Sequence, residues 1–118
     1  MMSFRTVTAA LLALGATAAV HANPVEITNA TDQTMNFTMR CSSPQAHEWK
    51  FFHAGVGEHG TINQRGCQRY SFELTTIRKG SGMEVTVKYS FAGGTRHKLI
   101  WDPDKRAFDS RKLQGSPA

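Results

Sequence analysis

Apolar residues recur at every second position in several stretches of this chain, and this alternation constrains its fold more than any other feature. The longest run has an apolar residue at each odd position from 83 to 91, and shorter runs cover 35–41 and 70–74. Successive side chains of a strand point to opposite faces, so this pattern predicts strands that are buried on one face. After residue 22 no sustained helical period of 3.6 residues occurs.

Clusters of Gly, Pro, Asn, Asp and Ser interrupt the alternating runs and predict turns between the strands. The sequence therefore predicts an all-β fold: a small antiparallel β-sandwich, or a small barrel, of about seven strands. One such domain is expected over 23–113, followed by a flexible tail over 114–118. The expected strands are 25–28, 34–41, 48–53, 68–76, 83–91, 95–101 and 106–113.

Residues 1–22 have the features of a secretory signal peptide. Arg5 precedes an uncharged run of small and apolar residues, and Val20-His21-Ala22 offers small residues for cleavage after Ala22. A membrane anchor is the alternative, but this run is shorter than the ~20 apolar residues of a spanning helix. The sequence predicts an exported protein, periplasmic or secreted, that does not span a membrane.

The chain has two cysteines, Cys41 and Cys67. In an oxidising compartment, a pair of cysteines in a small domain most often forms a disulfide. On the chain-entropy estimate, closing this loop stabilises the fold by roughly 3.5 kcal/mol. We therefore expect one disulfide between Cys41 and Cys67. The rival interpretation, a thiolate metal site, needs further ligands at suitable spacing.

Histidines near the cysteine pair raise the question of a metal site. His47, His53 and His59 are each six residues apart, and His97 follows further along the chain. Ligands on one helical face come at i and i+4, and on one strand face at i and i+2. Neither spacing occurs, so the sequence predicts no metal site and no cofactor. A periplasmic metal-handling protein that uses these histidines is the alternative hypothesis.

The segment between the cysteines also contains aromatic residues and a glycine-rich stretch. Trp49 and Phe51 would share one strand face and are predicted to lie in the core, whereas Phe52 would point to the other face. The stretch 54–66 has four glycines and predicts a long, mobile loop. No phosphate-binding or catalytic signature occurs in it, and we expect a protein that is not an enzyme.

A hairpin register gives the predicted binding surface. With a three-residue loop at 92–94, Tyr89 would pair with His97, and a four-residue loop at 102–105 would pair Leu99 with Phe108. This register gathers basic residues on one outer strand face, namely Lys88, Arg96, Lys98 and Arg111. The alternative is a merely solvated face.

The charge of the chain fits such a surface. Without residues 1–22, the chain has 13 Lys and Arg against 9 Asp and Glu, a net charge of +4. A modest positive charge favours weak attraction to polyanions, without specific recognition of nucleic acid. We therefore expect a small exported binding protein, without catalysis, whose partner is a protein or an anionic component of the cell envelope.

Overall fold

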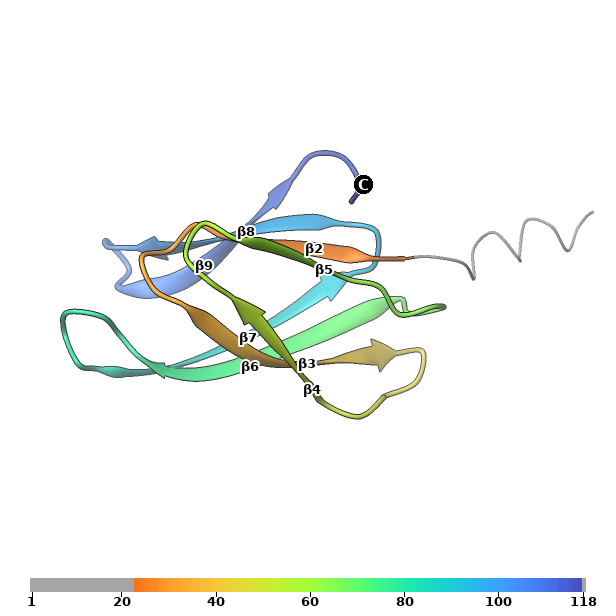
Figure 1. Ribbon diagram of the computed structural model, residues 1–118, viewed down its shortest axis with the longest axis horizontal. Coiled ribbons are helices and arrows are strands. Elements are labelled where there is room, and N and C mark those ends of the chain that lie inside the picture. The colour runs from red at the N-terminus through yellow and green to blue at the C-terminus, as the bar shows by residue number, and fades with distance from the viewer. Residues whose placement is uncertain (1–22, 118) are drawn as a thin grey trace, which may run out of the picture.

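The computed structural model describes residues 23–117, and the signal-peptide prediction lies outside this range. Within it the chain forms strands and no helix, so none of the described segments is a helix that could cross a membrane. Eight strands follow one another (Figure 1): β2 (Val25–Asn29), β3 (Met35–Ser43), β4 (Lys50–Ala54), β5 (His59–Ile62), β6 (Arg69–Ile77), β7 (Glu84–Ala92), β8 (Arg96–Asp102) and β9 (Ala107–Leu113).

The strands form two four-stranded sheets that pack face to face as a sandwich (Figure 1). The order β5-β2-β8-β9 makes one sheet, here called the β2 sheet, and the order β4-β3-β6-β7 makes the other, the β3 sheet. All neighbours are antiparallel except β2 and β8, which run parallel. The predicted all-β sandwich is confirmed, and two separate sheets exclude the small barrel.

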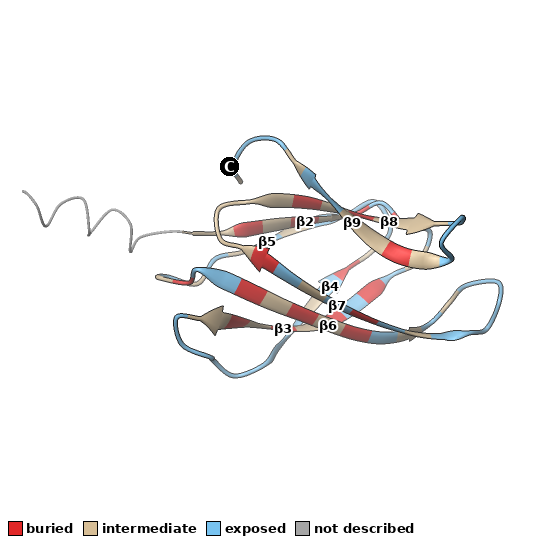
Figure 2. Ribbon diagram, turned by 180° about the vertical axis from the view of Figure 1, so that it is seen from behind, coloured by how far each residue is buried: buried red, intermediate tan, exposed pale blue. Residues whose placement is uncertain are grey.

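The alternating residues of the sequence form the core between the sheets. Figure 2 shows buried residues alternating with more exposed ones along the strands. Phe37 and Phe72 meet edge to face with ring centroids 5.8 Å apart, which anchors the centre of the β3 sheet on its inner side. Residues from both sheets complete this core: Val25, Ile27, Met35, Met39, Tyr70, Leu74, Val87, Phe91, Leu99 and Phe108.

The predicted disulfide between Cys41 and Cys67 is present, with the two Cα atoms 5.8 Å apart. Cys41 lies in β3, and Cys67 precedes β6, which pairs with β3. Both cysteines are buried and belong to the core cluster. The bond therefore fixes the end of β3 from which the chain leaves for β4.

The predicted loop 54–66 contains an additional strand. β5 pairs with β2, so that Val25 lies opposite Ile62 and Ile27 opposite Gly60. Its four residues hold a single apolar side chain among polar residues and a glycine, which hid the alternation. Gly60 also has a packing role, because a Cβ there would come within 2.9 Å of the Phe52 ring.

The prediction that Trp49 and Phe51 lie in the core is wrong. Phe52 points inward and packs edge to face on Phe72, with the ring centroids 5.7 Å apart. Phe51, in contrast, is 91% exposed and Trp49 is 40% exposed. In this segment apolar residues stand at odd positions (Trp49 and Phe51) and also at even positions (Phe52 and Ala54), so the alternation alone does not identify the inner face. The space over Gly60 accommodates the Phe52 ring, and this contact selects the observed phase.

The predicted hairpin of β7 and β8 is also wrong, because these strands belong to different sheets. The Gly93–Gly94 segment carries the chain from one sheet to the other. The Gly93 N–H donates to the Gln68 carbonyl in one layer, and the Gly94 N–H donates to the Pro24 carbonyl in the other. A Cβ at Gly93 would lie within 3.0 Å of the Cys67 carbonyl oxygen, so only glycine fits this crossing.

The predicted turn between β8 and β9 has the right length but begins one residue too early. Asp102 pairs with Ala107, so the loop covers 103–106 and Trp101 lies opposite Phe108. Arg106 adopts a positive φ of 54° at the end of this loop. The resulting register differs by two residues from the predicted one, which keeps the same residues on the inner face.

Candidate functional site

The four residues of the predicted basic face do not form one surface. Arg96, Lys98 and Arg111 lie on the outer face of the β2 sheet, where Lys98 is directly opposite Arg111. Lys88 lies on the outer face of the β3 sheet, opposite Glu73 of β6. The division follows from the crossing at Gly93–Gly94, which separates β7 from β8.

On the β2 sheet, Arg96 is already engaged. Its Nε donates to Glu26 Oε1 at 2.6 Å, and its Nη1 donates to the Gln114 carbonyl at 2.9 Å. Lys98 and Arg111 take part in no ion pair within residues 23–117. Like charges directly opposite one another destabilise a sheet slightly. Lys98 and Arg111, here called the basic row of the β2 sheet, are therefore a second, weaker candidate surface.

The four histidines occupy different parts of the fold. His47 Nδ1 contacts the Gln64 side-chain amide, and His53 Nδ1 contacts Asn36 Oδ1. His59 pairs with Thr28 at the edge of the β2 sheet. In the part of the chain that the structure describes, no group of three His, Cys, Asp or Glu side chains is arranged to hold a metal ion.

His97 is buried between the sheets instead. Its ring stacks on Phe91 with centroids 3.8 Å apart, and its Nε2 forms a hydrogen bond with the Thr95 hydroxyl. Burial lowers the pKa of His97, and the positive charge of Lys112 on the neighbouring strand lowers it further. The predicted hairpin placed His97 opposite Tyr89, whereas in the structure its stacking partner is Phe91.

The outer face of the β3 sheet carries a group of residues that the sequence did not reveal. We call it the Trp49 face. It comprises one outward-pointing row of side chains from each strand, in which Thr38 lies opposite both Phe51 and Glu73, and Glu73 lies opposite Lys88. The residues that concern the argument are Asn36, Thr38, Arg40, Trp49, Phe51, Arg69, Glu73, Thr75, Thr86 and Lys88.

Arg40 stacks on Trp49 on this face. Its guanidinium carbon lies 4.4 Å from the centroid of the indole ring, within the range of a cation–π interaction. The Arg40 Nε is buried and has no hydrogen-bond partner. The guanidinium covers one side of the ring, so Trp49 is held in a defined plane while much of it stays accessible.

The charges of the Trp49 face are predominantly positive around the two aromatic rings. The face carries three cations, Arg40, Arg69 and Lys88, and two carboxylates, Glu73 and, at the far end of β7, Glu84. Within residues 23–117 none of these five side chains takes part in an ion pair. Arg69 instead donates hydrogen bonds to the hydroxyl and carbonyl oxygens of Ser90. The charge of these three cations is therefore available to a partner.

A shallow hollow of about 200 Å³ lies on the same face, beside the strand position opposite Phe51. Thr38 forms part of its lining, and the Thr75 and Thr86 hydroxyls contact each other across it at 3.2 Å. The remaining lining residues are Asn36, Glu73 and Leu74. Hydroxyl, amide and carboxylate groups thus dominate the space next to the exposed rings.

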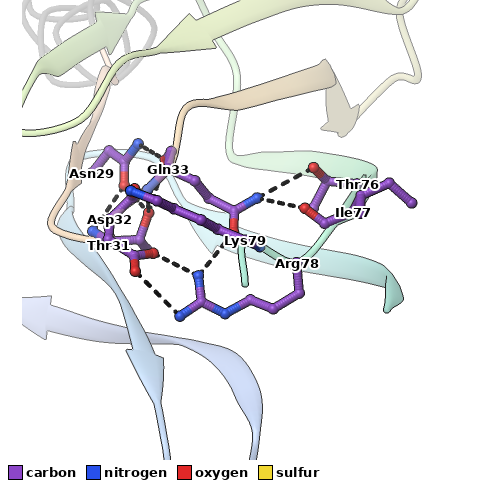
Figure 3. A network of polar contacts seen from close by, with 8 residues as sticks. All are labelled: Asn29, Thr31, Asp32, Gln33, Thr76, Ile77, Arg78 and Lys79. Atoms are coloured by element: carbon purple, nitrogen blue, oxygen red, sulfur yellow. Dashed lines mark hydrogen bonds and ion pairs between the residues drawn. The ribbon is translucent and has the colours of Figure 1, made fainter. Parts of the chain in front are cut away.

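A second arginine–tryptophan pair lies at the other end of β6. The Arg78 guanidinium lies 4.1 Å from the centroid of the Trp101 ring and 5.6 Å from that of Phe108. It also forms an ion pair with Asp32 and donates to Gln33 Oε1 (Figure 3). Hydrogen bonding to Arg78 holds the pKa of the Asp32 carboxyl below its usual value.

The network in Figure 3 joins the β2–β3 turn to the end of β6. The buried Asn29 side chain donates to the Gln33 and Ala54 carbonyls, and its own oxygen accepts from Thr31. Gln33 in turn donates to the Ile77 carbonyl. These groups satisfy one another, so the network is part of the framework that holds the two sheets together.

Comparison with known proteins identifies no relative: no protein-family model, curated protein or solved structure matches this chain.

Proposed function

We propose that this chain is an exported binding domain that recognises an anionic component of the cell envelope through the Trp49 face. It acts by binding and not by catalysis. The signal-like residues 1–22 support export, and a disulfide is compatible with an oxidising compartment. The sequence contains no catalytic signature around its Ser, His or Asp residues.

One observation carries the proposal: Trp49 and Phe51 are exposed on a sheet face that also carries three cations, none of which forms an ion pair within residues 23–117. Tryptophan and arginine dominate the energetic centres of protein interfaces, because they combine a large contact area with directional polar groups. Burying a ring such as Phe51 against a partner contributes on the order of 2 kcal/mol. The unpaired cations add attraction to a negatively charged partner.

A matched pair of charge reversals tests this proposal. Arg69→Glu with Lys88→Glu removes two cations from the Trp49 face, and Lys98→Glu with Arg111→Glu removes two from the basic row of the β2 sheet. Each protein is sedimented with cell-envelope fragments at low and at physiological ionic strength. The wild type should bind more weakly as salt rises, since the Debye length shrinks to about 8 Å at 0.15 M.

Reversal on the Trp49 face should abolish most of this binding, and reversal on the basic row should leave it nearly unchanged. The opposite ranking would assign binding to the basic row. Binding that neither salt nor either reversal alters would contradict recognition of an anionic partner. Thermal melting of all three proteins establishes that the substitutions leave the fold intact.

A further inference from the structure

We infer that the ligand of the Trp49 face is an acidic polysaccharide, whose sugar rings stack on Trp49 and Phe51. This inference rests on the proposed function and specifies its ligand. Three properties of the face support it: the placement of the two rings, the chemistry of the hollow beside them, and the balance of charge.

Trp49 immediately precedes β4 and Phe51 is the second residue of that strand, so their attachment points are about 7 Å apart along an extended chain. An aromatic ring has a negative face, and the C–H groups on one side of a pyranose ring present a positive, apolar surface to it. Phe51 is almost wholly exposed. Trp49 is held by Arg40 on one side, so its free part is already oriented before a ligand arrives.

The hollow beside the rings offers hydrogen bonds suited to sugar hydroxyls. Thr38, Thr75 and Thr86 contribute hydroxyls, and Asn36 contributes an amide. A hydroxyl both donates and accepts, so these groups can pair with the hydroxyls of a sugar in either sense. Thr38 is the cross-strand neighbour of Phe51, and a chain stacked on Phe51 would therefore pass directly over these groups.

Charge distinguishes an acidic polymer from a neutral one. The row that begins at Phe51 continues through Thr38 and Glu73 to Lys88, across four strands. Neighbouring strands are about 4.8 Å apart, so the row spans roughly 14 Å, which is long enough for a short oligosaccharide. Arg40 and Arg69 lie on the side of this row toward Cys41, and Glu84 lies on its other side, at the far end of β7. The three cations outnumber the carboxylates Glu73 and Glu84 and favour carboxylate-bearing sugars.

The same features disfavour insertion into a lipid bilayer. Interfacial binding buries an apolar surface about 5–10 Å deep among the headgroups and acyl chains. Here the rings lie on a flat sheet face, next to the hydroxyl and amide groups of the hollow. Pressing this face into hydrocarbon would remove from water the Glu73 carboxylate, which forms no ion pair within residues 23–117, and burying an unpaired charge costs free energy.

Titration with defined polymers tests the inference. The probes are two uronate polymers (polygalacturonate and alginate), neutral dextran, and phosphatidylglycerol vesicles. Tryptophan fluorescence and calorimetry give the affinities. The uronate polymers should bind, and dextran should bind at least about tenfold more weakly, because it lacks the charge that the cations attract. Loss of one stacked ring, in Phe51→Ala, should weaken polymer binding about tenfold.

Ile77→Ala is the matched control, because Ile77 is a 58% exposed apolar residue on the same sheet face but at the far end of β6. It should bind as the wild type does. Trp49→Ala should weaken binding as Phe51→Ala does. Since Phe51 contributes little to the fold, its variant keeps the test decisive even if Trp49→Ala lowers stability.

The outcomes separate this inference from the proposed function. Binding to envelope fragments that depends on Arg69 and Lys88, without binding to either uronate polymer, overturns the polysaccharide and leaves the proposed function standing. Binding to the vesicles alone assigns the face to lipid and also overturns it. Equal affinity for dextran and for uronates contradicts the role of charge. Failure to bind envelope fragments overturns both.

Discussion

Two arginines of this protein stack on tryptophan rings, and their surroundings differ in nearly every respect. Arg78 on Trp101 is 11% exposed in its side chain and is engaged by Asp32 and Gln33. Arg40 on Trp49 forms no ion pair within residues 23–117, and its Nε has no partner. The same kind of contact therefore stabilises the fold at the Arg78 end of β6 and forms part of an accessible surface at the Arg40 end.

The difference between the two pairs distinguishes contacts that stabilise the fold from contacts that are available to a partner. At Arg78 the polar and stacking contacts are all internal, so they contribute to folding. At Arg40 the stacking orients a ring while the charge stays available to a partner. The five predictions below test this contrast, from the largest expected effect to the smallest.

The disulfide next to Arg40 should have the largest effect on stability. Replacing both Cys41 and Cys67 by Ala releases a loop closed over 26 residues and should lower the free energy of unfolding by about 3.5 kcal/mol. Chemical denaturation measures this. A loss below about 1 kcal/mol would mean that the Arg40 end of β3 keeps its structure without the covalent bond.

Removing each arginine in turn compares the two stacks directly. Arg78→Ala should cost about 2 kcal/mol, since it removes a largely buried stacking contact and leaves Gln33 with fewer partners. Arg40→Ala should cost less than about 1 kcal/mol, the range of an exposed cation–π contact. Comparable losses from denaturant unfolding of both variants would contradict the contrast.

The pKa of Asp32 provides a second test of the Arg78–Trp101 stack. In the Arg78→Ala protein the pKa of Asp32 should rise toward its ordinary value, because hydrogen bonding to Arg78 is the main cause of its lowering. A carboxyl with a lowered pKa stabilises the fold above its ordinary pKa of 3.8, and this contribution is lost as pH falls further. An NMR titration of the carboxyl follows this change.

A smaller effect on stability is expected from protonation of His97 at low pH. The pKa of His97 is lowered by burial and by Lys112, so the unfolded chain takes up a proton at higher pH than the folded protein does. Stability should therefore be complete above pH 6.5 and fall as pH drops from 6.5 toward the lowered pKa. Melting curves of the wild type and of His97→Gln measure this, and the variant should lose this part of the pH dependence. Arg40→Ala should keep it.

The smallest effect on stability is expected at Phe51. A side chain that is 91% exposed contributes little to the fold, so Phe51→Ala should change the free energy of unfolding by less than about 0.5 kcal/mol. Its neighbour Phe52 packs on Phe72, and Phe52→Ala should cost several times more. Equal costs in denaturant titrations would show that Phe51 is part of the core after all.

These two neighbouring residues also show how far sequence reasoning extends. Where one phase of the alternation was apolar and the other polar, as in 35–41 and 85–91, the inner face was predicted correctly, although Met83 at the start of the second run is exposed. In 49–54 both phases contain apolar residues, and the choice depends on Gly60 of another strand. A contact between segments that are not neighbours leaves no signal in the local pattern.

The candidate site was missed for the same reason. The partition of the predicted basic residues depends on the crossing at Gly93–Gly94, where the sequence allowed a hairpin equally well. Arg40 was visible as an outward residue of an alternating strand. Its position over Trp49 follows only from the pairing of β3 with β4. The disulfide, in contrast, needed only two cysteines and their expected compartment.

The parallel pairing of β2 with β8 has a consequence for the order of folding. The β3 sheet joins strands that occur between Met35 and Ala92, each antiparallel to a partner nearby in the chain. β2, however, has one partner, β5, at intermediate distance in the chain and another, β8, about 70 residues further on, as its Glu26–Arg96 contact shows. Long-range pairing is slow, because the entropy of closing the intervening loop must be overcome first. In a chain that emerges from its amino end, β2 is made before the other strands of residues 23–117, yet its pairing with β8 must wait until β8 has emerged.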